Sequence, residues 1–202
     1  VMSDKRKRLV AYHEAGHALV GALMPDYDAV QKVTIIPRGR AGGLTWFLPS
    51  EERMQSRSYL QNQMAVALGG RIAEEIVFGD EEVTTGASSD LQQVAQIARR
   101  MVMRFGMSDS LGPVALGRSS GNMFLGRELS SERDFSEETA AIIDEEVKKL
   151  VQTAYDRAKL VLTQNRQILD RIASDLIERE TVDSEELQEI LNSSEVRLAG
   201  VL

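Results

Sequence analysis

Residues 9–21 read L-V-A-Y-H-E-A-G-H-A-L-V-G and contain both histidines of the 202-residue chain, His13 and His17. The apolar residues around the pair recur at helical spacing, and Ser3 can cap a helix that runs to about Met24. The two histidines stand one helical turn apart, so their imidazoles lie on the same face. This stretch therefore predicts a first helix that presents two imidazole groups side by side.

The motif H-E-A-G-H has the composition of a metal site. Two imidazole nitrogens on one helical face can each reach a single metal ion at about 2.0–2.1 Å. Glu14 is rotated by about 100° from His13 around the helix, so it is poorly placed as a ligand but can reach a water on the metal. This is the pattern of zinc hydrolases, in which the carboxylate acts as general base. We expect His13 and His17 to bind zinc and Glu14 to be catalytic.

A catalytic zinc ion needs a third protein ligand and an open position for water. The chain has no cysteine and no third histidine, so this ligand must be a carboxylate. The candidates are Glu74 or Glu75 in G-G-R-I-A-E-E-I and Asp90 in T-T-G-A-S-S-D-L. Each also has a simpler interpretation as a solvated helix charge, which the helix dipole favours near an N-terminus. The residues alone leave the choice between Asp90 and the glutamate pair open.

Most of the remaining chain is patterned as helices. Apolar residues four positions apart predict a helix over residues 56–77, although Gly69 and Gly70 each cost about 1 kcal/mol there relative to alanine. A close backbone approach by a neighbouring element is the physical reason that would justify them. Further helices are expected over about 88–105, 136–165 and 166–180, and a capping box at 183–186 opens a short final helix.

Strands are expected mainly near the N-terminal end. Residues 29–37 and 44–48 show the alternation of short strands. Residues 107–126 are punctuated by glycine and predict a loop with one short strand, and the tail from 192 to 202 is expected to be loosely ordered. The predicted fold class is mainly α, with a small β-sheet near the N-terminal end and a C-terminal helical bundle.

Residues 1–202 are interpreted as a single domain with two parts. Residues 1–126 hold the metal site and the small sheet and carry 14 basic and 13 acidic side chains, whereas 127–202 form the helical part with 10 basic and 18 acidic ones. Because a nucleic-acid binder normally shows a basic surplus, no nucleic-acid partner is expected. The one tight basic cluster, residues 5–8, is interpreted as a solvated first turn. The sequence also lacks a phosphate-binding P-loop and an apolar run of membrane-spanning length.

Several sequence blocks resemble, in the same order, the proteolytic domain of the FtsH family of membrane-anchored ATP-dependent zinc metalloproteases. Besides residues 9–21, they are V-T-I-I-P-R-G-R-A-G-G at 33–43, G-G-R-I-A-E-E-I-V-F-G at 69–79, T-T-G-A-S-S-D-L at 84–91, M-V-M-R-F-G-M-S at 101–108 and E-R-E-T-V-D-S-E-E-L at 178–187. The resemblance covers nearly the whole chain. The stretch L-T-W-F-L-P-S-E-E-R-M at 44–54 is similar to the sequences of family members from cyanobacteria and chloroplasts.

The resemblance assigns roles to individual residues. It implies one Zn2+ per chain held by His13, His17 and Asp90, with Glu14 as the catalytic carboxylate. It also implies that the glycine-bounded strand after P-R-G-R is an edge to which an extended peptide substrate adds by backbone hydrogen bonds. That substrate-binding strand comprises Gly43, Leu44, Thr45 and Trp46. The alternative is an internal strand in which Trp46 is part of the core.

The resemblance further implies that the chain is a fragment of a longer protein, without the transmembrane and ATPase modules. ATP would be used by the full-length protein only, and membrane contact would occur only through the absent segments. The expected assembly is a homo- or hetero-hexamer that degrades unfolded or damaged membrane and soluble proteins. This domain would lie on the cytoplasmic or stromal side of a plasma or thylakoid membrane. The competing interpretations are a proteolytically inactive assembly platform and a zinc hydrolase of non-peptide substrates.

Overall fold

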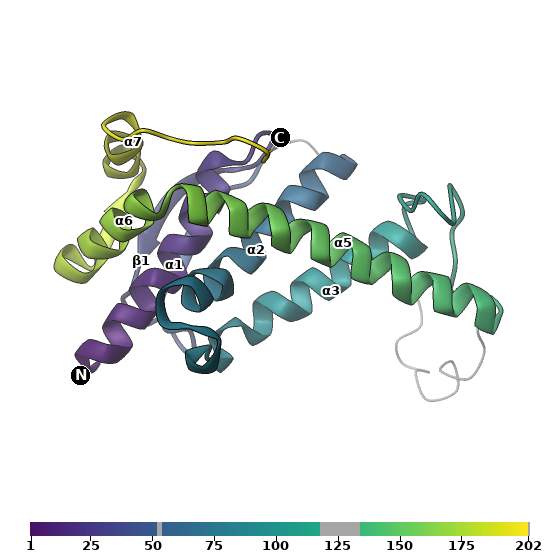
Figure 1. Cartoon of the computed structure of the whole chain (residues 1–202), viewed down its shortest axis with the longest axis horizontal. Helices are drawn as coiled ribbons and strands as arrows, with labels where there is room; N and C mark the ends of the chain where they lie inside the picture. The colour runs from purple at the N-terminus through teal and green to yellow at the C-terminus, as the bar shows by residue number, and fades with distance from the viewer. Residues whose placement is uncertain (52–53, 118–133, 202) are drawn as a thin grey trace.

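A computed structural model describes residues 1–51, 54–117 and 134–201 (Figure 1). Helices dominate these residues, so the predicted mainly α fold with a small sheet is confirmed. The domain boundary predicted after residue 126 lies outside the described residues. In chain order the elements are α1 (Asp4–Leu23), β1 (Ala29–Thr34), β2 (Leu44–Leu48), α2 (Arg57–Phe78), the 3-10 turns η1 (Asp80–Glu82) and η2 (Thr85–Ala87), α3 (Ser88–Met103), α5 (Glu137–Gln164), α6 (Arg166–Arg179), β3 (Thr181–Asp183) and α7 (Ser184–Asn192).

The helices α1 and α2 cross at two glycines. A Cβ atom added to Gly16 would collide with the carbonyl oxygen of Gly69, and one added to Gly69 would lie 2.7 Å from the carbonyl oxygen of Gly16. Any side chain at either position would therefore force the two backbones apart. The close backbone approach expected from the glycine pair in α2 is confirmed at Gly69. It brings the middle of α2 against the face of α1 that carries the histidines.

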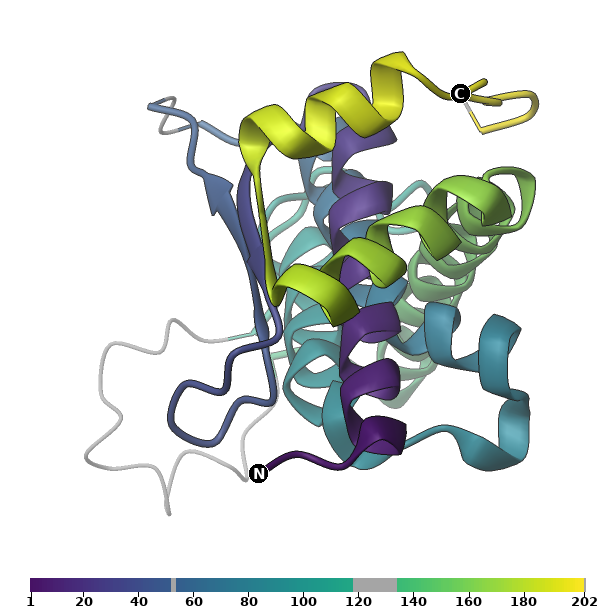
Figure 2. The same cartoon turned by 90° about the vertical axis from the view of Figure 1, so that its left-hand side faces the viewer.

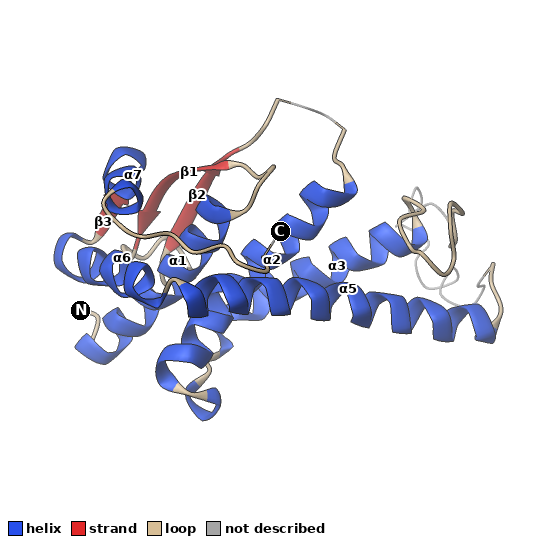
Figure 3. Ribbon diagram, turned by 45° about the horizontal axis from the view of Figure 1, so that its top comes forward, coloured by secondary structure: helices blue, strands red, loops and turns tan. Residues whose placement is uncertain are grey.

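The sheet has three antiparallel strands in the order β2-β1-β3 (Figure 3). Val33 of β1 pairs with Thr45 on one side and with Val182 of β3 on the other. The third strand was not expected, because three residues are too few to show an alternating pattern before the capping box of α7. The first strand ends at Thr34 rather than residue 37, and the backbone N–H of Ile35 then donates to the carbonyl of Glu180, just before β3.

The C-terminal helices complete one core with the N-terminal ones. The long helix α5 packs against α2 and α3, and α6 packs against α1 (Figures 1 and 2). A single cluster of buried side chains contains residues from two of the strands, β1 and β3, and from the helices α1, α2, α3, α5, α6 and α7. The C-terminal helices therefore pack mainly on the helices that form the metal site rather than on one another.

The C-terminal tail is anchored, so the expectation of a loosely ordered tail is wrong. The buried Asn165 donates from Nδ2 to the carbonyl of Arg197 at 2.8 Å and accepts from the backbone N–H of Arg197 at 2.8 Å. Gln164 donates to the carbonyl of Ala199 at 2.7 Å, and the side chain of Val201 is buried. Amide side chains at the C-terminal end of α5 thus substitute for backbone pairing, and the tail itself shows no periodic pattern.

The segment after α3 is held by a buried carboxylate rather than by a strand. In the described part of the expected loop and strand, the only pairing is an isolated bridge between Ser108 and Gly112; the rest of that prediction lies outside the described residues. Glu146 of α5 accepts from the hydroxyl of Ser108 at 2.6 Å and from the backbone N–H of Ser110 at 2.9 Å. These hydrogen bonds lower the pKa of Glu146 to about 2 from a usual value of 4.5.

Replacing Glu146 with glutamine is expected to lower the free energy of unfolding by about 2 kcal/mol at pH 7, because hydrogen bonds to a charged acceptor are lost. Since folding lowers this pKa, the carboxylate stabilises the fold above its unfolded value and loses that contribution between about pH 4.5 and pH 2. Denaturant titrations at pH 7 and pH 3 should therefore show a smaller difference between the variant and the parent at the lower pH. The exposed neighbour Glu145 supplies the control, Glu145→Gln. Equal stability of both variants at pH 7 would contradict the anchoring role.

In the described ranges, no helix combines the length and the apolar character that a membrane span requires.

Candidate metal centre

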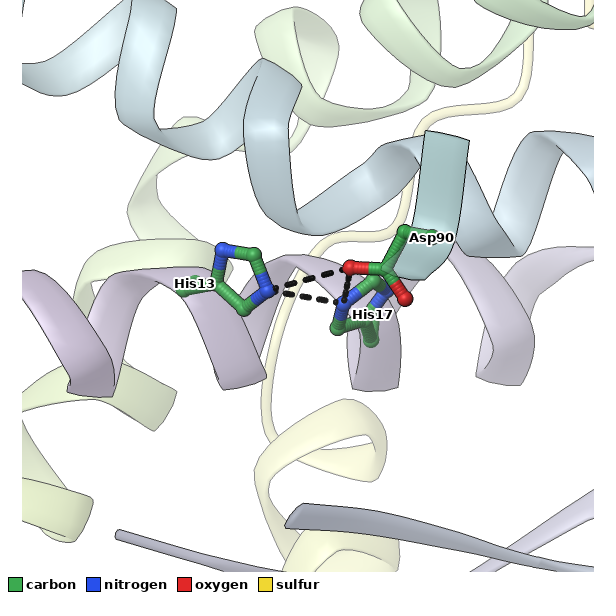
Figure 4. Close-up of side chains that lie close together, drawn as sticks. All are labelled: His13, His17 and Asp90. Atoms are coloured by element: carbon green, nitrogen blue, oxygen red, sulfur yellow. Dashed lines mark hydrogen bonds and ion pairs between the residues drawn. The ribbon is translucent and has the colours of Figure 1, made fainter. Parts of the chain in front are cut away.

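Three donor atoms from two helices converge in the structure (Figure 4). The Nε2 atoms of His13 and His17, one turn apart on α1, lie 3.1 Å from each other. Oδ2 of Asp90, in the first turn of α3, lies 3.4 Å from Nε2 of His13 and 3.3 Å from Nε2 of His17. The imidazole pair predicted from the motif is therefore present, and the carboxylate that meets it comes from residue 90.

The outer nitrogen of each imidazole has its own partner. Nδ1 of His17 lies 2.7 Å from the carbonyl oxygen of Val66, and Nδ1 of His13 lies 2.8 Å from Oε2 of Glu74. A carbonyl oxygen can only accept, and the Glu74 carboxylate is itself an acceptor, so both Nδ1 atoms carry the proton. In a neutral imidazole with its proton on Nδ1, the Nε2 atom keeps its lone pair for a metal ion. Such hydrogen bonds to the outer nitrogen are typical of metal-binding histidines.

The spacing of the three donor atoms fits a tetrahedral ion. Ligands at about 2.0–2.1 Å in tetrahedral geometry lie about 3.3 Å from one another. The observed separations of 3.1, 3.3 and 3.4 Å agree with this value. Two nitrogen atoms and one carboxylate oxygen are ligands that zinc accepts, and three protein ligands leave one position open. The residues present therefore fit a catalytic zinc ion.

Gly70 of α2 keeps space free beside the donor atoms. A Cβ atom at this position would lie 2.5 Å from Nε2 of His17 and 2.6 Å from Nε2 of His13. It would thus intrude on the space between the two nitrogens that a shared ion needs. The second glycine of the pair in α2 consequently has a different role from Gly69, which permits the helix crossing.

The electrostatics of the cluster favour a positive charge. Burial alone lowers the pKa of His13, but hydrogen bonds to the carboxylates of Asp90 and Glu74 outweigh it and raise this pKa to about 10. Burial alone raises the pKa of Asp90, but hydrogen bonds from both imidazoles hold it well below its usual range. Both shifts arise because the imidazoles and the carboxylates stabilise each other's charged forms. A divalent cation bound at the cluster would be stabilised by the same negative charges that stabilise a proton there.

The two glutamates that sequence reasoning left as alternatives lie elsewhere. Glu74 is fully buried behind His13, on the Nδ1 side, and accepts from the N–H and hydroxyl of Thr84 at 3.1 and 2.7 Å. Burial raises the pKa of Glu74, but the hydrogen bonds from His13 and Thr84 outweigh it and lower this pKa. Glu75 accepts from Arg71 and from the hydroxyl of Tyr155. Neither carboxylate faces the Nε2 atoms.

Glu14 is 7% exposed and lines the same cleft as the histidines. The hydroxyl of Thr45 in β2 lies 2.7 Å from Oε2 of Glu14 and 3.1 Å from its backbone carbonyl. A hydroxyl has one proton, and the shorter, charged acceptor is the stronger partner. Thr45 therefore ties the expected catalytic carboxylate to the strand beside it and limits its rotation.

The cleft over the cluster has a volume of about 1140 Å3. One wall is β2 with the loop before it, and the other is formed by α2 and by the segment from η2 into α3. In the described residues, β2 pairs only with β1 and is thus an edge strand. An extended peptide could add to such an edge, as the resemblance to the family implies.

The four residues of the expected substrate-binding strand do not share one environment. Gly43 is buried, and a Cβ atom there would lie 2.9 Å from Cγ of Glu14. Leu44 and Thr45 line the cleft, whereas Trp46 does not. Trp46 is 41% exposed and lies between the cationic groups of Lys32 and Arg38 on the outer face of the sheet. The alternative that Trp46 is a core residue is therefore wrong.

The sequence did not predict four features around the cluster. They are the carbonyl of Val66 beside His17, the hydrogen bond between Glu74 and His13, the space left by the missing side chain of Gly70 and the hydrogen bond from Thr84 to Glu74. Glu74 and Gly70 lie in the block at residues 69–79, where the sequence marks Glu74 as a candidate ligand and Gly70 as a site of close backbone approach. The carbonyl of Val66 carries no side-chain signal, since every residue has a carbonyl. Their positions depend on where α2 crosses α1, which only the folded chain specifies.

Comparison with known proteins identifies the family of the chain. A model of peptidase family M41 matches residues 1–190. The chain is 74% identical over 203 residues to the ATP-dependent zinc metalloprotease FtsH 3 of Synechocystis sp., which covers 98% of this chain and 33% of that protein. It is 67% identical over 198 residues to the ATP-dependent zinc metalloprotease FtsH of Synechococcus sp., covering 97% of this chain and 31% of the relative.

A third relative is the chloroplastic ATP-dependent zinc metalloprotease FTSH 5 of Arabidopsis thaliana, which is 59% identical over 202 residues. The alignment covers 98% of this chain and 29% of that protein. The chain thus spans about a third of the length of these relatives. The relatives come from the two lineages that residues 44–54 resemble, and the match of the family model extends across the helices that carry the donor atoms. The chain belongs to peptidase family M41 and to the FtsH proteases of cyanobacteria and chloroplasts within it.

Proposed function

We propose that this chain is a zinc-dependent endopeptidase domain that hydrolyses peptide bonds in extended polypeptides. The observation that carries the proposal is the convergence of two Nε2 atoms and one Asp90 oxygen beside Glu14, in a cleft bounded by an edge strand. The names of the relatives, which are zinc metalloproteases, support the same reaction class.

His13, His17 and Asp90 would hold the Zn2+ ion. A bound zinc ion supplies a Lewis acid that polarises the scissile carbonyl and lowers the pKa of water toward about 7. The hydrogen bonds from Nδ1 of His13 to Glu74 and from Nδ1 of His17 to Val66 orient the imidazoles before any metal binds. This preorganisation limits the conformational entropy that metal binding must cost.

Glu14 would act as general base and then as general acid. Its carboxylate takes a proton from the attacking water at Oε1 or Oε2 and delivers it to the leaving amine nitrogen. The hydrogen bond from Thr45 holds the carboxylate beside the edge strand on which the substrate would lie. We propose Gly43, Leu44, Thr45 and Trp46 as this substrate-binding strand, with Trp46 contributing backbone groups rather than a side chain in the cleft.

The properties of the full-length protein follow the relatives and are part of the proposal. We infer that a longer chain, anchored in a plasma or thylakoid membrane, carries this domain on its cytoplasmic or stromal side. In that protein an ATP-driven module would unfold damaged membrane or soluble proteins and deliver them to the domain. Homo- or hetero-hexamers of like subunits would enclose the active sites. This chain itself, as a single domain of residues 1–202, would bind zinc but not ATP.

An inactive assembly platform is the competing function. It would not require a general base, yet Glu14 is retained, buried in the cleft and oriented by Thr45. The two functions predict opposite results in one experiment. Zinc content by atomic absorption and cleavage of unstructured casein are measured before chelation, after dialysis against a chelator, and after Zn2+ is restored. Loss and recovery of cleavage support the peptidase; one bound zinc per chain with no cleavage in any state would support the platform.

Replacing Asp90 with asparagine is expected to weaken zinc binding by at least about 100-fold, since removal of a direct ligand should exceed the effect of removing an outer partner. Glu74→Gln, which disturbs only the partner of His13, is expected to weaken binding by about 10- to 100-fold. Glu75→Gln serves as the matched control and should bind as the parent does. Competition titrations with a fluorescent zinc chelator measure all three. A parent-like affinity of the Asp90→Asn variant would assign the third ligand elsewhere.

A further inference from the structure

The cleft follows the first helix for most of its length. Residues from Ser3, the N-cap of α1, to His17 line it, a run of about 21 Å at the usual helical rise. The donor atoms and Glu14 lie toward the C-terminal end of this run. An extended chain of about six residues would span the same distance. The cleft can therefore contact substrate residues well away from the bond that is cleaved.

The N-terminal end of the cleft is cationic. Lys5 and Arg6 of α1 line it on one side, and Arg40, in the loop that precedes β2, lines it on the other. Lys5 makes only a 3.9 Å contact with Glu82, with both side chains highly exposed, so this pair contributes little. Among the described residues, Arg6 and Arg40 form no ion pair. Two guanidinium groups thus line the cleft without a carboxylate partner in the described part of the chain.

The other end of the cleft has the opposite character. Tyr27, Phe47, Val66 and Ala67 line it, and the rings of Tyr27 and Phe47 pack edge to face at 5.3 Å. No lysine or arginine of the described chain lines this end. The acidic residues of the cleft lining, Glu14 and Asp90, both belong to the metal centre between the two ends. The two sides of the metal centre therefore differ in chemistry.

The direction of β2 relates these ends to the direction of a substrate. A Cβ on Gly43, just before β2, would lie 2.9 Å from Val10, whereas Phe47 near its end contacts Gly21, so β2 runs in the same direction as α1. A peptide that pairs antiparallel to β2 has its N-terminal side near Phe47 and its C-terminal side near Arg40. Antiparallel pairing is the slightly more stable arrangement. From Glu14 to Arg6 the helix rises about 12 Å, which equals three to four extended residues.

We propose that Arg6 and Arg40 are specificity determinants that favour substrates with acidic side chains about three to four residues on the C-terminal side of the scissile bond. This proposal rests on the peptidase function proposed above. The charge pattern makes the acidic segments of a polypeptide bind best in one orientation. Arg6, a member of the basic cluster that the sequence alone suggested was merely solvated, thereby gains a role in substrate choice.

The first experiment measures binding without turnover. Zinc-loaded Glu14→Gln protein is titrated with fluorescein-labelled ten-residue peptides that share an apolar centre and carry Asp-Asp, Asn-Asn or Lys-Lys toward the C-terminus. We expect the Asp-Asp peptide to bind about fivefold more tightly than the Asn-Asn peptide, consistent with two exposed charge pairs. The preference should vanish at 1 M salt, where the Debye length is about 3 Å. In the background of Arg6→Glu and Arg40→Glu together, the Lys-Lys peptide should bind best.

Controls separate this proposal from its alternatives. Arg99→Glu reverses an exposed charge on α3 outside the cleft and should leave the ranking unchanged. A mirrored peptide with Asp-Asp toward its N-terminus should bind no better than Asn-Asn. Equal affinities for the three peptides, or a preference for the mirrored peptide, would overturn the proposal. The second experiment maps the bonds that the active zinc-loaded chain cleaves. If no bond is cleaved although the binding preference is present, the peptidase function fails and the charge selectivity stands.

Discussion

Replacing Glu14 with glutamine is expected to lower kcat for peptide cleavage by about 10²- to 10⁴-fold, the usual contribution of general acid–base catalysis. The amide has nearly the same size as the carboxylate, and its oxygen can still accept the hydrogen bond from Thr45. The donor atoms of His13, His17 and Asp90 are untouched, so the chain should keep one Zn2+. Steady-state kinetics with a fluorogenic peptide, paired with zinc analysis of the same sample, measure both quantities.

A suitable control for this variant is Glu81→Gln. Glu81 is an exposed acid of η1 that does not line the cleft, so its replacement removes the same charge without touching the reaction. The control should retain the kcat of the parent. Full activity of the Glu14→Gln variant, or loss of zinc from it, would show that Glu14 is not the proton carrier.

Replacing Gly70 with alanine is expected to weaken zinc binding by about 100-fold or more, although the residue is not a ligand. The added methyl group would lie 2.5 and 2.6 Å from the two Nε2 atoms, in the space that the ion needs. To admit zinc, the imidazoles would have to rotate and break their Nδ1 hydrogen bonds to Val66 and Glu74. Outer-partner losses of this kind alone cost 10- to 100-fold in affinity. Competition titration measures the change.

Gly69→Ala provides the contrast, because its Cβ would meet the carbonyl of Gly16 at 2.7 Å rather than the imidazoles. This variant should lose stability, because α1 and α2 must separate, while its folded fraction binds zinc as the parent does. Gly70→Ala should instead retain most of its stability, since alanine is favoured over glycine by about 1 kcal/mol in a helix interior. Parent-like zinc affinity of Gly70→Ala would refute the idea that this glycine keeps the ion's position open.

Local patterns predicted most of the secondary structure because their causes are local. The caps of α1, α2 and α7 are hydrogen bonds between residues three apart, Ser3 with Arg6, Ser56 with Tyr59 and Asp183 with Glu186. The spacing of the two histidines is likewise a property of one helix. It defines two thirds of the donor set without any knowledge of the tertiary structure.

The remaining features depend on distant parts of the chain. Asp90 meets the imidazoles only because α3 begins beside α1, and chemistry could not separate it from Glu74 or Glu75 in the sequence. The strand β3 was missed because its three residues acquire strand geometry by pairing with β1. Trp46 has the apolar character of a core residue, yet cations on the outer face of the sheet stabilise it in an exposed position.

The pairing of β1 with β3 also has a consequence for biosynthesis. The hydroxyls of Thr34 and Thr181 are hydrogen-bonded across a sequence separation of 147 residues. During translation, the strand that supports the cleft wall therefore gains its second neighbour only after almost the entire domain has left the ribosome. Contacts this distant in the chain form late. The wall of the cleft would consequently be completed only after residues 181–183 have been synthesised.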